Sequence, residues 1–135
     1  MAFTGNFTCN SFKSGLIDGD FDFDTDTFKI ALYTNSASLN AETAAYTTSG
    51  EVSGSGYTAG GNTLTVSKGI TGGTAFITFT DTSWSAAITA RGALIYKDSG
   101  AAVCVLDFGS DKTSTTTFSV DFPVASSTDA LIRLS

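Results

Sequence analysis

Four aspartates at every second position make one stretch of this sequence chemically conspicuous. They are Asp20, Asp22, Asp24 and Asp26. Carboxylates at this spacing resemble the start of a calcium-binding loop, in which oxygen ligands alternate along the chain. Such a loop also needs a Gly at its sixth position and a Glu at its twelfth. Counted from Asp18, those positions hold Phe23 and Lys29, so the sequence argues against a metal site.

The residues between these aspartates indicate a different role for the stretch. Phe21, Phe23 and Thr25 alternate with the carboxylates, which is the period of a strand with one apolar and one acidic face. We expect an edge strand whose charges face solvent and discourage pairing with other chains. One alternative is that the four carboxylates bind basic groups of a partner protein, and another is that they bind a cation.

The side chains of common enzyme mechanisms are missing or badly placed. The chain has no histidine, which removes the usual general base, the Ser/His and Cys/His pairs and ordinary zinc sites. The lysines lie in or beside polar, turn-rich stretches, where they stay solvated rather than activating a serine. Paired carboxylates can hydrolyse a glycan, but Trp84 is the single tryptophan that such a site could use. We therefore predict that the protein is not an enzyme and takes no cofactor.

The charge of the chain excludes further classes of partner. Its net charge is −6 and its pI is near 4.2, and its basic residues form no cluster that would bind phosphates. No apolar run reaches the roughly 20 residues that cross a bilayer, and the first residues do not have the pattern of a secretion signal. We expect neither nucleic acid nor a membrane as partner.

The glycine-rich run Gly54–Gly61 resembles a phosphate-binding loop only superficially. It has no lysine partner and does not open a helix, whereas phosphate cradles commonly use both. We expect an ordinary loop whose glycines permit tight turns and whose Tyr57 anchors it to the domain.

Two cysteines, Cys9 and Cys104, lie far apart in the sequence, and Cys104 falls within the apolar run Ala102–Leu106. Free cysteines are commonly buried as small apolar side chains, so we expect two reduced thiols. A disulfide that joins the N-terminal segment to the sheet is the alternative.

The periodicity of the chain predicts mainly strands. One short helix is expected over residues 10–19, with Asn10 or Ser11 as its cap and Gly19 as its stop. Phe28–Tyr33 is the clearest early strand, and residues 34–61 have the composition of a loop. Further strands are predicted over residues 63–66, 75–80, 92–97, 102–108, 116–122 and 130–134, with a short extended piece at Trp84.

Short strands separated by turns, such as residues 98–100 and 109–112, are typical of a sandwich or a small barrel. We therefore predict an all-β fold, an antiparallel, jelly-roll-like β-sandwich with a short N-terminal helix. Residues 1–27 are expected to form an arm of helix plus acidic strand, and residues 28–135 the sandwich domain. The run Ala102–Leu106 is apolar on both faces and should be a central strand or contact another subunit. The predicted core contains Phe28, Ile30, Leu32, Phe76, Leu94, Phe118, Val120 and Phe122.

Several of these stretches resemble a group of small tailed-bacteriophage structural proteins. They are Phe28–Thr34, Gly56–Gly61, Ala90–Tyr96 and Val105–Gly109, and with residues 116–122 the resemblance covers most of the chain beyond residue 28. The group includes proteins similar to capsid decoration, or cement, proteins. Its motifs concern shape rather than an active site, so they do not distinguish head from tail.

The resemblance implies a non-enzymatic virion protein made in the host cytoplasm. Our leading hypothesis is a capsid decoration protein on the outer surface of the capsid, which stabilises the head by bridging major capsid subunits. Its expected partners are the major capsid protein and further copies of itself, as a homotrimer. The acidic stretch carries the least of the family pattern, so a partner-specific contact is expected there. The alternatives are a tail or fibre-associated protein and a carbohydrate-binding adhesion module. The aromatic candidates for sugar binding are Trp84, Tyr33, Tyr46 and Tyr57.

Overall fold

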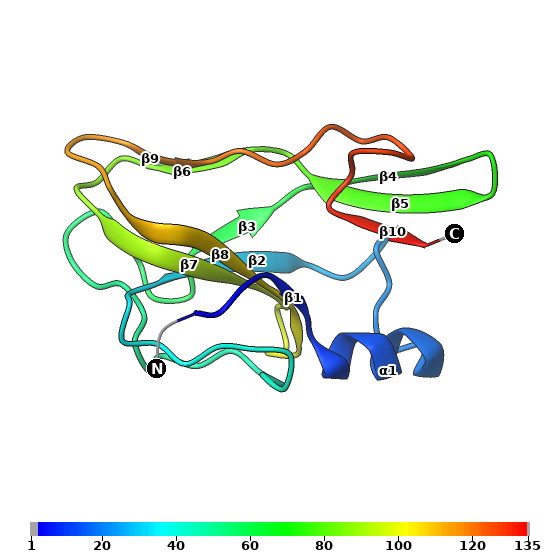
Figure 1. Ribbon diagram of the computed structural model, residues 1–135, viewed down its shortest axis with the longest axis horizontal. Coiled ribbons are helices and arrows are strands. Elements are labelled where there is room, and N and C mark those ends of the chain that lie inside the picture. The colour runs from blue at the N-terminus through cyan, green and yellow to red at the C-terminus, as the bar shows by residue number, and fades with distance from the viewer. Residues whose placement is uncertain (1–2, 135) are drawn as a thin grey trace.

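The computed structural model describes residues 3–134 and consists mainly of β-strands (Figure 1). One helix, α1, spans Asn10–Asp18. The strands are β1 (Phe7–Thr8), β2 (Phe28–Tyr33), β3 (Asn62–Leu64), β4 (Val66–Thr71), β5 (Thr74–Phe79), β6 (Thr82–Trp84), β7 (Thr89–Lys97), β8 (Ala102–Thr113), β9 (Phe118–Val120) and β10 (Ile132–Leu134). The strands pair antiparallel. The predicted all-β antiparallel fold with a short N-terminal helix is therefore confirmed.

The strands form sheets that stack in two layers. The larger sheet has the order β1-β8-β7-β2-β3, and the smaller sheets have the orders β10-β5-β4 and β6-β9. Figure 1 shows the two smaller sheets end to end above the larger one, with α1 at the bottom of the molecule, below β4, β5 and β10. The buried side chains form one cluster that joins both layers and also includes residues of α1 and of the loop 34–61. Among the residues predicted to be in the core, only Phe122 is half-buried rather than buried.

The first part of β8 is buried on both faces, as its sequence predicts for a central strand. β8 lies between β1 and β7, and its residues Ala102 to Val105 are buried. α1 lies against β8, and the hydroxyl of Ser11 donates a hydrogen bond to the carbonyl of Ala102 over 3.1 Å. Ala102 to Val105 are thus buried without a neighbouring subunit, whereas Leu106 is half-buried.

The acidic stretch is a loop, which corrects the prediction of an edge strand. The N–H of Asp24 donates to the carboxylate of Asp22 over 2.9 Å, and the N–H of Asp22 donates to the carboxylate of Asp26 over 2.8 Å. Aspartate side chains that bind nearby backbone groups in this way favour turns over sheet ladders. The two phenylalanine rings of the stretch stack on Phe28 in the core. The alternation of Phe and Asp therefore comes from turns that direct the rings inward.

Residues 3–27 are packed into the same core as the rest of the chain. β1 pairs with β8, and Phe3, Phe12 and Phe21 belong to the main cluster of buried side chains. The rings of Phe12 and Phe21 meet edge to face at 4.9 Å. The sequence predicts a boundary between an arm over 1–27 and a domain over 28–135. In the structure, side chains on the two sides of this boundary pack against each other.

β8 continues to Thr113, through the region where the sequence predicts a turn over residues 109–112. Its pairing with β7 is nevertheless interrupted there, since Gly92 pairs with Asp107 and the next pair joins Ala90 to Lys112. The residues between Asp107 and Lys112 form a bulge, in which Gly109 has a φ of 85°. The turn-forming residues thus interrupt a strand instead of ending it, because the residues on both sides find partners on β7.

Helix α1 ends as predicted but begins differently. Gly19 follows it with a left-handed φ of 81°. Neither Asn10 nor Ser11 caps the start, where Cys9 occupies the capping position without a side-chain hydrogen bond. The hydroxyl of Ser11 is bound to Ala102 instead. Within residues 3–134, no helix has the length and apolar character needed to cross a membrane.

Candidate functional site

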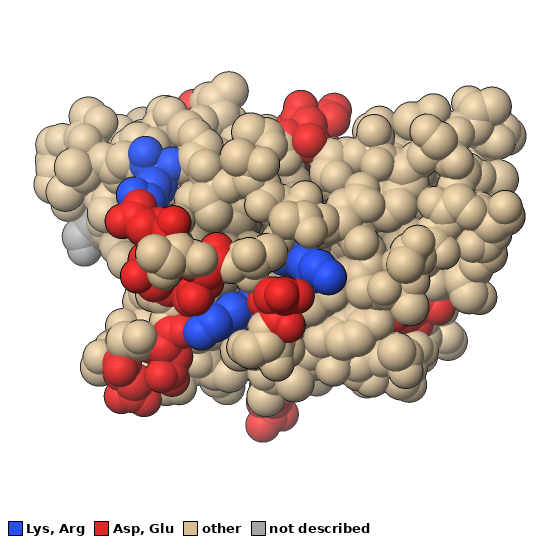
Figure 2. All heavy atoms as spheres, turned by 180° about the vertical axis from the view of Figure 1, so that it is seen from behind, with Lys and Arg blue, Asp and Glu red and all other residues tan. Residues whose placement is uncertain are grey.

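Carboxylates of the acidic loop, defined here as residues 18–26, gather with lysines of other elements on one face of the molecule (Figure 2). Lys68 of β4 pairs with Asp24 at 2.7 Å, and Lys97 of β7 pairs with Asp26 at 3.3 Å. The ammonium group of Lys97 also donates to the backbone carbonyl of Asp20 over 2.6 Å. Two of the four carboxylates predicted to contact a partner are therefore paired with cations of the same chain.

Asp22 is engaged by the loop itself. The backbone N–H of Asp24, followed by the hydroxyl of Thr25, lowers the pKa of Asp22. Among the residues that the structure describes, the carboxylates of Asp18 and Asp20 form neither a hydrogen bond nor an ion pair, so they are the available charges of the acidic loop.

The described residues also hold no group of three or more His, Cys, Asp or Glu placed to bind a metal ion.

The chain's four tyrosines gather around Glu51, a residue that the sequence analysis does not single out. One oxygen of Glu51, Oε1, accepts a hydrogen bond from the hydroxyl of Tyr46 over 2.6 Å. The other, Oε2, accepts from the hydroxyl of Tyr57 over 2.6 Å and from the N–H of Gly60 over 2.8 Å. The hydroxyl of Tyr57 in turn accepts from the N–H of Leu32 in β2 over 2.9 Å. One carboxylate thus fastens residues 46–60 to β2.

The tyrosine cluster, defined as Tyr33, Tyr46, Tyr57 and Tyr96, is completed by two backbone contacts. The hydroxyl of Tyr33 donates to the carbonyl of Thr47, and that of Tyr96 donates to the carbonyl of Gly60, each over 2.6 Å. Burial and the negative charge of Glu51 raise the pKa of all four phenols, to about 12 for Tyr96. The cluster therefore holds neutral hydrogen-bond donors rather than a base or nucleophile.

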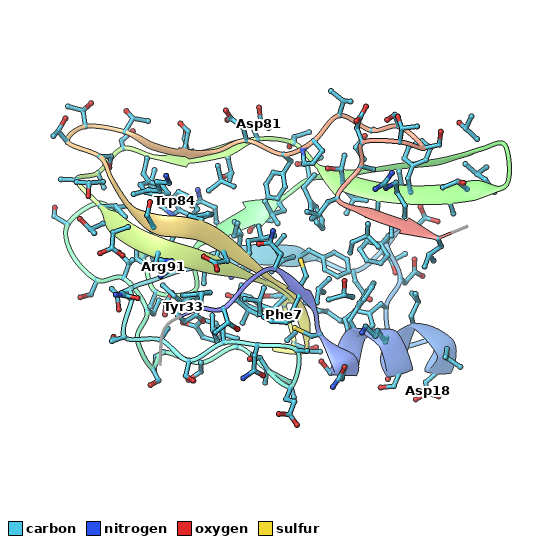
Figure 3. All side chains as sticks on the ribbon, in the orientation of Figure 1. Phe7, Asp18, Tyr33, Asp81, Trp84 and Arg91 are labelled. Carbon is cyan, nitrogen blue, oxygen red and sulfur yellow. The ribbon has the colours of Figure 1, made fainter. Side chains whose placement is uncertain are left out.

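The aromatic side chains that would form a sugar platform face inward. Tyr33, Trp84 and Tyr57 are 0%, 4% and 8% exposed. Trp84 points from β6 toward the five-stranded sheet (Figure 3), and its ring lies 6.0 Å from that of Tyr57. Sugar binding by aromatic stacking needs an accessible ring face. Three of the four candidates for the carbohydrate-binding alternative are therefore core residues.

An ion pair between Arg91 and Asp107 joins β7 to β8, and the sequence analysis does not predict it. The guanidinium contacts both carboxylate oxygens, at 3.1 and 3.4 Å, and both side chains are mostly buried. Arg91 also donates to the carbonyl of Phe3, and the side-chain oxygen of Asn6 accepts from the N–H of Asp107 over 2.6 Å. The pair thus ties the N-terminal segment to the sheet.

The glycine-rich run 54–61 is a loop held by Tyr57, as predicted. Gly61 has a φ of +78°, and a Cβ there would overlap the carbonyl of Ile30 in β2. Only glycine permits this conformation together with so close an approach of two backbones. Gly61 therefore serves the packing of the loop on β2.

Both cysteines are free and buried, which confirms the prediction of reduced thiols. Burial raises the pKa of Cys9 to about 11 and also raises the pKa of Cys104. A thiol reacts as its thiolate, so neither side chain is prepared to act as a nucleophile.

The two sides of the sandwich differ. On one side, the amide nitrogen of Asn62 in β3 donates to the hydroxyl of Thr82 and the carbonyl of Ser83 in β6, each over 2.9 Å. On the other side, a groove of about 440 Å³ separates the end of β8 from β9. This β8–β9 groove is lined by Phe108, Lys112, Thr117, Phe118, Ser119 and Asp121, among others. The sandwich is therefore closed at the β3 side and open at the β8–β9 groove.

Comparisons of the chain with family models, with curated proteins and with solved structures gave no match. The stretches on which the expected phage resemblance rests lie together in the structure. Phe28–Thr34, Ala90–Tyr96 and Val105–Gly109 fall in the adjacent strands β2, β7 and β8, and Gly56–Gly61 packs on β2. These stretches build the centre of the fold, so the functional site has to be sought on the surface around it.

Proposed function

We propose that this protein is a non-enzymatic structural component of a virion, a capsid decoration protein that binds the major capsid protein from outside. The main support is that the segments resembling phage structural proteins form the central strands β2, β7 and β8 with the loop that packs on them. These residues build a rigid scaffold. Such a scaffold suits a protein that acts through its shape and surface.

Exposed strand edges supply a means of binding without chemistry. Each small sheet ends in two strands with one unpaired side, β10 and β4 in one sheet and β6 and β9 in the other. Such edges offer N–H and C=O groups to an extended segment of another chain. A domain that bridges neighbouring capsid subunits in this way would stabilise a shell under pressure from packaged DNA.

The acidic loop is the proposed contact with basic groups of the capsid, with different roles for its residues. The carboxylates of Asp22 and Asp26 shape the loop by accepting backbone hydrogen bonds, and Asp24 and Asp26 pair with Lys68 and Lys97 of the same chain. The exposed Asp20, together with Asp18, supplies the charge that remains for a partner. Attraction of this kind weakens as salt shortens the screening length from about 10 Å at 0.1 M to about 3 Å at 1 M.

Binding to capsids that lack the protein tests this contact. We expect the double variant Asp18→Asn with Asp20→Asn to bind about fivefold more weakly at low salt, because exposed ion pairs contribute about 0.2–1 kcal/mol each. The control is Glu42→Gln with Asp111→Asn, which makes the same change of net charge at exposed positions elsewhere. Equal occupancy for both double variants, unchanged by salt, would show that the acidic loop is not the contact.

The position of the protein on the particle tests the proposal as a whole. Cryo-electron microscopy of the virus that carries it should show its density on the outer capsid surface. Density on the tail or fibres would instead support the second candidate, a tail-associated structural protein. The homotrimer that the resemblance implies stays a prediction, and a mass of three chains for the isolated protein would support it over a two-fold contact.

A further inference from the structure

The open side of the sandwich leaves one edge of β9 unpaired. β9 pairs with β6 alone, and the β8–β9 groove runs along its other edge. A strand at the edge of an antiparallel sheet directs part of its backbone hydrogen-bonding groups outward. Phe118 and Val120 point inward and are 6% and 7% exposed, while Ser119 between them is exposed. The edge therefore has an apolar inner side and a small polar outer side.

We propose that this edge pairs with the same edge of a second copy of the chain to give a two-fold symmetric dimer. In an antiparallel pair centred on Ser119, this residue faces its own symmetry mate and Phe118 faces the partner's Val120. On the outer side, Thr117 faces the partner's Asp121. This register keeps the apolar side chains of both copies on the inner face, because side chains alternate strictly along a strand. The two β6–β9 pairs then form one continuous four-stranded sheet.

The charges in the β8–β9 groove fit this arrangement. Lys112 lies before the connection 114–117 that leads into β9, and Asp121 directly follows β9. Neither side chain forms an ion pair within residues 3–134. In the proposed antiparallel pair, the partner's Asp121 lies at the start of β9, opposite Thr117. Lys112 precedes the connection that leads to this end of β9, so each Lys112 is brought toward the partner's Asp121. The groove is thus complementary in charge to itself, as a two-fold contact requires.

The edge of β4 is less suited to the same role. Its Lys68 is bound to Asp24 of the acidic loop at 2.7 Å. A symmetric pair centred on Lys68 would place two lysines opposite one another, which is destabilising. Lysine in an edge strand is a common protection against pairing. β9 contains no charged residue between Phe118 and Val120.

A cysteine placed on the proposed symmetry axis tests the register. Directly opposed Cα atoms in an antiparallel pair are about 4.5–5.5 Å apart, which is within the range of about 4.4–6.8 Å that a disulfide spans. We expect Ser119→Cys to give mostly covalent dimer, at twice the 13.9 kDa of the chain, under mild oxidation. The control is Ser83→Cys, exposed on β6 next to Ser119. The native cysteines are buried and do not compete. Equal cross-linking of the two variants would overturn the proposal.

Exchange of the two charges tests the contact without a new cysteine. Sedimentation of the wild-type protein should show a dimer, and Lys112→Glu and Asp121→Lys should each weaken association by about tenfold or more, because each opposes two like charges. The variant with both substitutions should regain the affinity, which a contact with any other protein would not produce. Lys13→Glu, at an exposed helix position that forms no ion pair within residues 3–134, makes the same charge change as Lys112→Glu and should have no effect.

Three further results would overturn the two-fold contact. They are a wild-type protein that stays monomeric at all concentrations, a mass of three chains, and a double variant that does not regain affinity. Circular dichroism of each variant establishes that it is folded. The isolated protein is used throughout, so a failure here leaves the proposed capsid role to its own test on particles.

Discussion

At the scale of single residues, Glu51 shows how the direction of hydrogen bonds determines what a position tolerates. The hydroxyl of Tyr57 accepts from Leu32, so its own hydrogen is directed to Oε2 of Glu51, where Gly60 also donates. The hydroxyl of Tyr46 at Oε1 has no such constraint and can turn to accept. A glutamine therefore fits if its oxygen takes the place of Oε2 and its nitrogen that of Oε1. An alanine leaves all of these donors without their acceptor.

We expect Glu51→Ala to lower the free energy of unfolding by about 3 kcal/mol and Glu51→Gln by about 1 kcal/mol, because buried donors that lose a charged acceptor are costly. Urea denaturation followed by fluorescence measures both. Glu42→Ala, at an exposed position of the same long loop, serves as control and should change stability by less than about 0.5 kcal/mol. Equal losses for the Ala and Gln variants at position 51 would contradict the assignment of donors and acceptors.

The tyrosine cluster also predicts how stability depends on alkaline pH. The pKa of each phenol is raised above its ordinary value of 10, to about 12 for Tyr96. A raised pKa means that the folded state holds the proton more tightly than the unfolded state. The contribution of these protonated phenols to the free energy of unfolding is therefore complete below pH 10 and is lost as pH rises through 12 and above.

Absorbance at 295 nm, recorded against pH for the native protein and in urea, measures this difference. The native phenols should ionise at clearly higher pH than the unfolded ones, in the same pH range in which circular dichroism reports unfolding. Ionisation near pH 10 with the fold intact would show that the hydroxyls are accessible to solvent.

Sequence reasoning identifies the core residues at this scale but misses Glu51 and Arg91. Alternation marks Phe28, Ile30 and Leu32 as inward because burial follows the local period of a strand. Glu51 and Arg91 acquire their roles from partners distant in the chain. Glu51 resembles any glutamate of a polar loop, and nothing near it in sequence reveals the tyrosines that surround it.

At the scale of elements, strands are predicted well where the side chains alone decide the conformation. β2 has the predicted bounds, Phe28–Tyr33, because apolar side chains alternate there without competing groups. The acidic loop has the same alternation but not the same structure, since Asp22 and Asp26 bind neighbouring backbone N–H groups. Period alone does not distinguish a strand from a series of turns when the polar residue is aspartate.

Helix α1 carries two large apolar side chains with opposite environments. Phe12 is 2% exposed and contacts Phe21, whereas Ile17 is 88% exposed. We expect Phe12→Ala to lower the free energy of unfolding by about 3–5 kcal/mol, the usual cost of a cavity left by a buried phenylalanine. Ile17→Ala should change it by less than about 0.5 kcal/mol.

Denaturant titration of both helix variants measures how firmly residues 3–27 belong to the core. A small effect of Phe12→Ala would indicate that α1 is the separable arm that the sequence suggests, and would contradict the packing of its ring.

At the scale of the whole molecule, strand spacing indicates an all-β sandwich but not how its sheets divide. The two smaller sheets share one layer, and pairs such as β10 with β5 and β9 with β6 join distant segments. Which strands become neighbours depends on tertiary packing that a local pattern does not encode. The open side at the β8–β9 groove is a result of this arrangement and has no signal in the sequence.

The pairing of β1 with β8 has a consequence for folding during synthesis on the ribosome. Phe7 is the neighbour of Val105, so the larger sheet cannot be completed until most of the polypeptide has emerged. At a synthesis rate of about 5–20 residues per second, the first strand waits roughly 5–20 seconds for its partner. During that time β4 and β5, joined by a short turn, can already form a hairpin. The phenylalanines near the N-terminus stay exposed, because the side chains that bury them in the folded protein are not all synthesised. Nascent chains of this protein should therefore depend on chaperones that shield exposed aromatic segments until translation has passed β8.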